Sequence, residues 1–342
     1  MLDDLKLIHN RDAQDALGRA EKQWQQLDAE FEVQAGLLPD RIDNVVWAGM
    51  GGSALSALVA QKWPGVNRPF EIVRDYELPQ YVGENTLCFI ASYSGNTEET
   101  LEAFARAEAA GAHIVVIAHG GKLQQLATEK GLPFLFIPDA GQPRYAVWFI
   151  LKAALTVFDA CGLTDGAVAA LVAEKSWLEQ QTAAWKPDVA TGQNYAKQIA
   201  LELMGKSVVI YAGPRLFPAA YKWKISCNEN AKHIAWCNQF SEFNHNEFIG
   251  WSKQPVDKPY AVVELRSTLE HERIQKRFEV SDRLLSGMRP SPIVVDVQGD
   301  TLLRQLMYAI ALGDFATLYL ALLNGIDPTP VDLIEKFKVE LG

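Results

Sequence analysis

The chain has 342 residues, 49% of them hydrophobic, and a formal net charge of −10 at pH 7. This length accommodates about two domains of roughly 150 residues each, and this apolar content excludes an intrinsically disordered chain. The acidic balance and the lack of a long basic run argue against nucleic acid as the main partner, because nucleic acids are bound through Lys and Arg clusters.

The first half of the chain alternates strand and helix patterns. Short apolar runs rich in β-branched or aromatic residues predict strands at 45–48, 70–75, 87–91, 114–118 and 134–137. Helical patterns lie between most of them, at 54–61, 101–110 and 123–130. Because runs this apolar suit strands buried on both faces, the βαβ rhythm predicts a doubly wound α/β domain with a parallel sheet.

A helical region from residue 145 to about 203 separates this rhythm from a second one. Its most apolar stretch, 146–163, is interrupted by Lys152 and Asp159, so it predicts a buried helix rather than a membrane span. Strand patterns then follow at 207–212, 233–237, 260–265 and 292–297, with helical patterns at 217–228, 269–285 and 302–323. We therefore expect two doubly wound α/β domains, 1–162 and 163–342.

Two features of the composition indicate the compartment. The first residues, MLDDLKLIHNRD, lack the apolar core of a secretory signal peptide. The four cysteines, Cys88, Cys161, Cys227 and Cys237, show no CxxC spacing. We expect a cytoplasmic protein with no membrane partner and no metal site.

Hydroxyl side chains gather between the third strand pattern and the helix that follows. Ser92, Ser94 and Thr97 surround Gly95 in the segment TLCFIASYSGNTEET. A helix N-terminus offers backbone N–H groups and the positive end of the helix dipole. The segment therefore predicts a site for a phosphate group.

The same segment also fits an ordinary helix start. Thr97 could cap the helix, and Glu98 and Glu99 are the acidic residues expected in a first turn. Since those carboxylates would repel a phosphate, the phosphate interpretation requires them to face away from it.

A second turn follows the first strand pattern, in the sequence WAGMGGSALSALVA. Gly49, Gly51 and Gly52 predict a tight turn before Ser53, where a ligand can approach the backbone. The run also fits a loose dinucleotide pattern, with Asp75 near the position of a ribose-binding acid, so a nicotinamide or flavin enzyme is a rival. Two such turns on one sheet suit a single phosphate better than an extended pyrophosphate.

Three residues could carry proton transfer or charge stabilisation. Glu229, which follows a helical pattern among apolar neighbours, could act as a base or could pair with Lys232. His245 lies in a loop and could shuttle a proton or satisfy a loop carbonyl. Arg144 could face a developing oxyanion or form a surface ion pair.

One more helix start lies near the C-terminus, in GIDPTPVDLIEKFK. It predicts a helix opening at Thr329 and Pro330, with Lys336 two turns in. By itself this pattern is structural.

Taken together, these segments resemble a known family. The segments GMGGS, SYSGNTEET, QPR, NENAK, FSEFNHNE and DPTPVDLIEKFK resemble the bifunctional phosphoglucose/phosphomannose isomerases of the sugar isomerase (SIS) superfamily. SGNTEET is typical of the superfamily, and NENAK together with FSEFNHNE is typical of the family. The resemblance spans nearly the whole chain and implies two Rossmann-like, SIS-type domains.

The resemblance implies interconversion of glucose 6-phosphate or mannose 6-phosphate with fructose 6-phosphate through a cis-enediol, without cofactor or metal. It implies that the sugar phosphate is held by Gly52, Ser53, Ser92, Ser94 and Thr97.

The resemblance also implies roles around the reacting carbons. Glu229 would move the proton between C2 and C1, and Arg144 would stabilise the enediolate. His245 would assist ring opening from the neighbouring subunit of a homodimer. Lys336 would lie near the ring oxygen, and Thr329 matches a position associated with accepting both C2 epimers.

Two other classes share this superfamily. One is the sugar-phosphate half of a glucosamine-6-phosphate synthase, which needs a glutaminase region that we do not find in this sequence. The other is a sugar-phosphate sensor without catalysis, which often carries a basic DNA-binding segment that is also missing from the sequence.

Overall fold

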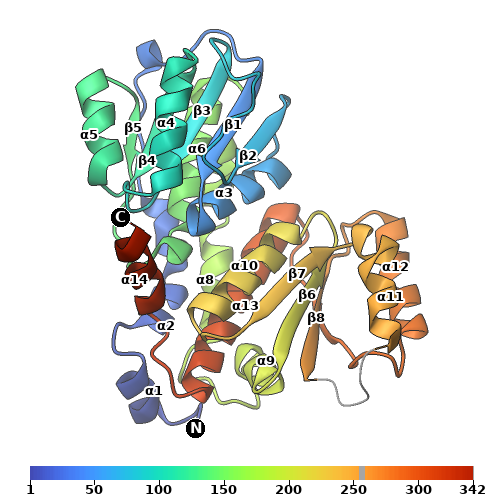
Figure 1. Ribbon diagram of the computed structural model, residues 1–342. Coiled ribbons are helices and arrows are strands. Elements are labelled where there is room, and N and C mark those ends of the chain that lie inside the picture. Colours follow the sequence, from blue (N-terminus) through green and yellow to red (C-terminus); the bar gives the residue numbers. More distant parts are fainter. Residues whose placement is uncertain (254–258, 342) are drawn as a thin grey trace. The chain divides into compact units, whose positions relative to one another are not determined.

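The computed structural model describes residues 1–253 and 259–341, and the chain divides into two compact units (Figure 1). One unit spans Lys22–Trp177, and the other combines Met1–Glu21 with Leu178–Gly342. Each unit contains its own parallel β-sheet flanked by helices. This confirms the predicted fold class.

The unit of residues 22–177 is built on a five-stranded sheet with the order β2-β1-β3-β4-β5, and every pair is parallel. Its strands are β1 (Asn44–Gly49), β2 (Phe70–Val73), β3 (Thr86–Ala91), β4 (His113–Ala118) and β5 (Phe134–Phe136). Its helices are η1 (Gln23–Asp28), η2 (Ala35–Leu37), α3 (Gly51–Lys62), α4 (Glu98–Ala109), α5 (Gly121–Lys130), η3 (Pro143–Tyr145), α6 (Val147–Ala160) and α7 (Ala167–Ala173). The chain leaves this unit within α8 (Lys175–Ala183).

Both faces of this sheet are buried, which is why its strands are apolar throughout. Alternate side chains of a strand point to opposite faces. Val46 of β1 belongs to a core cluster with Phe104 of α4. Trp47, one residue later, stacks on Phe89 with ring centroids 5.1 Å apart, and Phe89 meets Phe158 of α6 at 5.2 Å. Helices α4 and α6 therefore cover opposite faces.

The other unit is built on a four-stranded parallel sheet with the order β7-β6-β8-β9. Its strands are β6 (Ser207–Ala212), β7 (Ala235–Gln239), β8 (Tyr260–Arg266) and β9 (Ile293–Asp296). Its helices are α1 (Leu5–Arg11), α2 (Ala16–Glu21), α9 (Tyr195–Leu203), α10 (Phe217–Glu229), η4 (Glu242–His245), α11 (Glu247–Gly250), η5 (Trp251–Lys253), α12 (Glu272–Leu284), α13 (Leu302–Leu323) and α14 (Asp332–Leu341). The order repeats that of β2-β1-β3-β4, so the two sheets share one topology.

Helix α13 forms the centre of this second unit. Among the described residues it is the one helix long and apolar enough to cross a membrane, but 94% of its most apolar window is buried inside the fold. Trp223 of α10 lies so close to Gly313 that an added Cβ would stand 2.3 Å from its ring, and its indole N–H donates to Ala309 O at 2.6 Å. The helix is therefore a core element.

The two units differ from the expected domains, 1–162 and 163–342, at the start of the chain and at the boundary between the domains. Residues 1–21 join the second unit, where Asp3 pairs with Lys197 at 3.0 Å and Arg11 donates to Leu322 O. Residues 163–177 stay with the first unit, because α7 packs on α6 and η1. Helical periodicity identifies a buried face but does not indicate which core covers it.

Three predicted elements need correction. The helical region 145–203 is broken into four helices, with Gly162 and Gly166 at φ +66° and +67° in the first break. The strand expected at 233–237 lies at Ala235–Gln239. The helix expected to open at Thr329 and Pro330 begins at Asp332.

Candidate active site

The sheet order places two predicted ligand turns at one point of the first unit. Strands β1 and β3 are neighbours, and the connections that follow them run to opposite sides of the pair. In open α/β sheets, ligands bind beyond the carboxyl ends of strands at such a reversal. The expected glycine turn after β1 is shorter than predicted, because Met50 alone separates β1 from α3, which begins at Gly51, and the turn at residues 92–97 follows β3.

Hydrogen bonds join the hydroxyl residues of these turns. Ser53 Oγ accepts from the Tyr93 backbone N–H at 3.1 Å, which ties the first turn to the second. Ser92 Oγ lies 2.8 Å from Thr97 Oγ1 and 3.4 Å from Ser94 Oγ. Ser53 and Ser92 are buried, whereas Ser94 is exposed. The predicted hydroxyl cluster is therefore assembled, with one end open to solvent.

The hydroxyls at the start of α4 bond within their own turn, where Ser92 Oγ and Ser94 Oγ also accept from the backbone N–H groups of Gly95 and Asn96 at 3.2 and 3.3 Å. Thr97 occupies the N-cap position, but its side chain caps no backbone N–H and bonds to Ser92 instead. Glu98 accepts a hydrogen bond from Tyr76 OH at 3.2 Å, so this carboxylate is engaged away from the hydroxyl cluster. The N-terminal end of this helix therefore carries the neutral hydroxyls together with the two first-turn carboxylates, Glu98 and Glu99.

A second glycine turn, which the sequence analysis missed, holds the hydroxyl turn in place. Gly95 has φ +68°, and a Cβ on it would lie 1.8 Å from Gly120 O. Asn96 Oδ1 accepts from the Lys122 N–H at 2.9 Å, and Gly95 O accepts from the Leu123 N–H at 3.0 Å. The paired glycines after the fourth strand were the available sequence signal.

Gly52 and Arg144 belong to the same end of this unit. A Cβ on Gly52 would lie 2.7 Å from the Pro143 carbonyl, so only glycine allows η3 this close. Arg144 is 1% exposed, and its guanidinium donates to Gln142 Oε1 at 3.3 Å and lies 4.7 Å from the Tyr145 ring centroid. Arg144 is therefore a buried residue and does not lie on the surface.

Tyr93 connects the hydroxyl turn to the loop before Arg144. Its hydroxyl donates to Asp139 Oδ1 at 3.0 Å and accepts from the Ala140 N–H at 2.7 Å. Its ring stacks on His119 with centroids 5.3 Å apart. Burial raises the pKa of Tyr93 to about 12, so the hydroxyl stays protonated at neutral pH.

In the second unit, Glu229 is the last residue of α10 and is half-buried. Lys232, with φ +49°, donates from Nζ to Asp327 O at 3.0 Å and Pro328 O at 3.2 Å. These bonds tie the segment that carries Thr329 to the turn after Glu229. Thr329 itself is 2% exposed.

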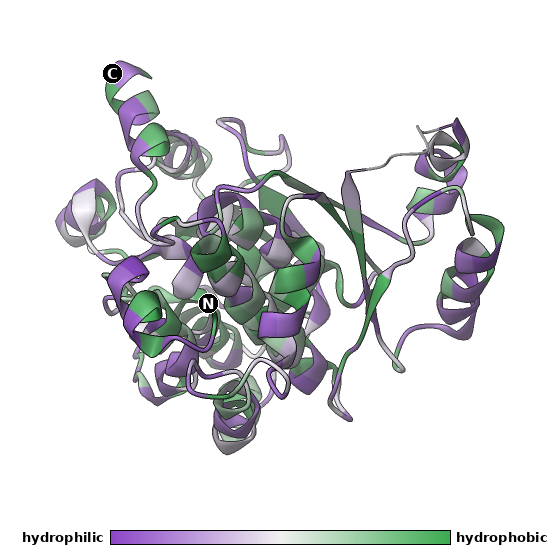
Figure 2. Ribbon diagram, turned by 90° about the horizontal axis from the view of Figure 1, so that it is seen from below, coloured by the Kyte–Doolittle hydropathy of each residue, from purple (hydrophilic) through white to green (hydrophobic). Residues whose placement is uncertain are grey.

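His245 and Lys336 lie on exposed elements of the second unit. His245 ends η4 and is exposed. Lys336 pairs with Glu340 at 3.6 Å along α14, a helix that carries both polar and apolar residues (Figure 2).

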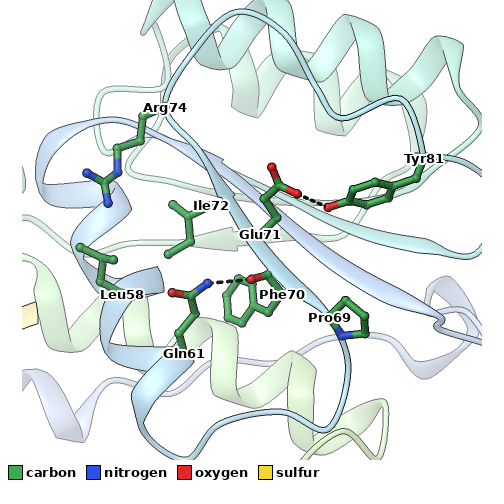
Figure 3. Close-up of a pocket in the computed structure, with 8 residues that line it drawn as sticks. All are labelled: Leu58, Gln61, Pro69, Phe70, Glu71, Ile72, Arg74 and Tyr81. Atoms are coloured by element: carbon green, nitrogen blue, oxygen red, sulfur yellow. Dashed lines mark hydrogen bonds between the residues drawn. The ribbon is translucent and has the colours of Figure 1, made fainter. Parts of the chain in front are cut away.

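A surface hollow of about 490 Å³ lies along strand β2 (Figure 3). None of the predicted site residues line it. Its polar groups already bond within the fold, Tyr81 OH to Glu71 at 2.5 Å and Gln61 to Phe70 O at 2.7 Å. Nothing in it points to a ligand. Across residues 1–253 and 259–341, no group of three or more His, Cys, Asp or Glu side chains is placed to hold a metal ion.

Comparisons with known proteins agree on one family. Residues 192–341 match the model of the bacterial phospho-glucose isomerase C-terminal SIS domain. A bifunctional phosphoglucose/phosphomannose isomerase of Aquifex aeolicus is 33% identical over 301 residues, which is 87% of this chain and 90% of the relative. Another, of Caldicellulosiruptor bescii, is 34% identical over 314 residues, or 91% and 93%.

A solved structure shows the same fold. The crystal structure of a glucose-6-phosphate isomerase like protein from Thermus thermophilus aligns with a TM-score of 0.66 at 17% identity, covering 99% of this chain and 98% of that one. From the similarities to the curated relatives, the chain belongs to the bifunctional phosphoglucose/phosphomannose isomerase family.

Proposed function

We propose that this protein is an aldose–ketose isomerase that interconverts glucose 6-phosphate and mannose 6-phosphate with fructose 6-phosphate. The family supports this activity. The observation that carries it is the cluster of Ser92, Ser94 and Thr97 hydroxyls beside the start of α4, which Thr97 does not cap. Such a cluster suits a phosphomonoester.

The phosphate fixes the substrate without taking part in the reaction. In this proposal Ser53 and the three hydroxyls of the second turn bind it, and Gly52 lets it approach the backbone. Because the phosphate is remote from the reacting carbons, its binding energy orients C1 and C2 for chemistry.

The first step is ring opening, which we assign to His245. The bond between the ring oxygen and the anomeric carbon breaks, the ring oxygen gains a proton and the anomeric hydroxyl loses one. An imidazole can supply and accept these protons near neutral pH. Lys336 is assigned to the ring oxygen.

The second step moves a proton between neighbouring carbons. Glu229 takes the proton from C2 of the aldose and leaves a cis-enediolate with its charge on the C1 oxygen. The proton of the C2 hydroxyl passes to the C1 oxygen, and Glu229 returns its proton to C1, so that C2 becomes the carbonyl carbon of the ketose. Arg144 stabilises the negative charge on the enediolate oxygens. Thr329 is assigned to the C2 hydroxyl, where glucose and mannose differ.

We further propose a cytoplasmic homodimer in which His245 acts in the site of the partner subunit. His245 is exposed at the end of η4, where a second copy can reach it. The four free cysteines fit a reducing compartment.

An assay with fructose 6-phosphate as the sole substrate tests the activity. We expect both glucose 6-phosphate and mannose 6-phosphate to form without glutamine, ammonia or added nicotinamide. Formation of glucosamine 6-phosphate only when glutamine is added would indicate the synthase chemistry instead. Saturable binding without any aldose product would indicate a sensor, and either result would overturn the proposal.

A further inference from the structure

Three residues of one irregular segment converge on a single buried side chain. The segment 242–253, which includes His245, consists of short helices and pairs with no strand. Tyr211 of β6 is fully buried beneath it. The sequence analysis gave Tyr211 no role.

Two of the three residues bind the Tyr211 hydroxyl. Glu247, two residues after His245, bonds to Tyr211 OH through Oε1, while its Oε2 accepts from Asn238 at 2.7 Å. The Trp251 indole N–H donates to the same hydroxyl at 3.0 Å. The Tyr211 hydroxyl therefore donates to the Glu247 carboxylate and accepts from the Trp251 indole N–H, so both its donor and its acceptor capacity are used.

The third residue packs on the Tyr211 ring. Phe243, two residues before His245, has its ring centroid 4.5 Å from that of Tyr211. The side chains two residues before and two residues after His245 are thus both held by one side chain of a strand, that of Tyr211. His245 itself remains exposed.

Tyr211 is held firmly in turn. The Arg289 guanidinium lies 5.8 Å from its ring centroid and is fixed by Glu264 at 2.5 Å and Asp282 at 2.7 Å. Burial and the nearby Glu247 raise the pKa of the Tyr211 hydroxyl, so it remains a proton donor across the working pH range.

We propose that Tyr211 is a positioning residue for ring opening, which holds His245 at its working place through Phe243, Glu247 and Trp251. This inference rests on the proposed function, because it takes ring opening as the task of His245. Tyr211 acts through His245 and touches no substrate.

The Tyr211→Phe variant isolates the hydroxyl, since the ring that packs on Phe243 is kept. It removes the hydrogen-bond partner that Glu247 and Trp251 share and lets the segment shift. A displacement of about 1 Å in a catalytic group costs about 100-fold in rate. We expect kcat/KM for fructose 6-phosphate to fall by about 10- to 100-fold.

A substrate that cannot close a ring separates positioning from general damage. 5-Deoxyfructose 6-phosphate lacks the hydroxyl that forms the furanose ring, so exchange of its C1 hydrogen with D₂O needs only the base. We expect Tyr211→Phe and His245→Ala to leave this exchange nearly unchanged. The double variant should react with fructose 6-phosphate at the rate of His245→Ala alone, because both changes affect one step.

Tyr319→Phe is the matched control. Its hydroxyl is equally buried and donates to Trp185 O at 2.6 Å, but its ring lies in α13 beside Phe315 and the Lys197 ammonium. For Tyr319→Phe, the ratio of kcat/KM for fructose 6-phosphate to the exchange rate of 5-deoxyfructose 6-phosphate should equal the ratio for the unaltered protein. Glu247→Ala is a second test if Tyr211→Phe folds poorly, because it removes the carboxylate that accepts from the Tyr211 hydroxyl, and it should show the same selective loss.

Two outcomes would overturn the proposal, and they are distinguishable. If His245→Ala is selective but Tyr211→Phe slows both substrates equally, Tyr211 is merely structural. If His245→Ala itself shows no selectivity, the assigned role of His245 is wrong, and the proposal for Tyr211 is wrong with it.

Discussion

Replacing Glu229 by Gln will lower kcat for the isomerisation of fructose 6-phosphate by about 100- to 10,000-fold, the usual contribution of a positioned general base. The amide has nearly the same size and keeps the fold, but it cannot accept the proton from carbon. Ligand binding should change little, because the phosphate is assigned to residues 52–97. The measurement is kcat by a coupled assay, together with the Kd of sorbitol 6-phosphate, which has no carbonyl to react.

Glu202→Gln is the control for this substitution, since Glu202 is an exposed carboxylate on α9 of the same unit. It should leave both kcat and Kd unchanged. Near-normal kcat in Glu229→Gln would show that another group is the base. A parallel loss of sorbitol 6-phosphate binding would show that Glu229 holds the sugar rather than moving its proton.

Loss of the Lys222 charge will destabilise the fold by about 3–5 kcal/mol, the usual cost of breaking a buried ion pair. Lys222 of α10 and Asp314 of α13 are buried, 2.5 Å apart, and Ser226 Oγ bonds to both side chains at 3.0 and 3.1 Å. Lys222→Met leaves Asp314 charged and without this partner inside the core. The free energy of unfolding from urea denaturation measures the loss.

The double variant Lys222→Met/Asp314→Leu should recover most of that stability, because apolar replacement of a whole buried pair is often neutral. The exposed pair Lys276 and Glu279, 2.6 Å apart, supplies the control, and Lys276→Met should leave the free energy of unfolding nearly unchanged. A double variant as unstable as the single one would show that the polar groups themselves specify how α10 packs on α13.

The sequence predicted an element most accurately where the residues that indicate it lie close together in the chain. The helix 302–323 was predicted with the observed bounds, and the strands of both sheets were found within a few residues. Buried strands and helices carry continuous apolar runs that can be read without knowledge of their neighbours. The hydroxyl turn was equally accessible, because Ser92, Ser94 and Thr97 lie close together in the chain as well as in space.

The sequence predicted poorly where partners are distant along the chain. The bond from Tyr211 to Glu247 spans 36 residues, and that from Tyr93 to Asp139 spans 46. The ion pair of Asp3 with Lys197, which ties the N-terminus to the second unit, spans 194 residues. No periodicity records such pairs. The later start of α14, at Asp332, has a similar reason, because Lys232 holds the carbonyls of Asp327 and Pro328 before it.

The transfer of hydrogen between C2 and C1 tests the central proposal most directly. Glucose 6-phosphate deuterated at C2 is converted in ordinary water, and the fructose 6-phosphate is analysed by NMR for deuterium at C1. A single carboxylate that carries the proton across an enediol predicts deuterium at C1 in part of the product and solvent hydrogen in the rest. Complete retention of deuterium would indicate a hydride shift and contradict the assignment of Glu229 as the base.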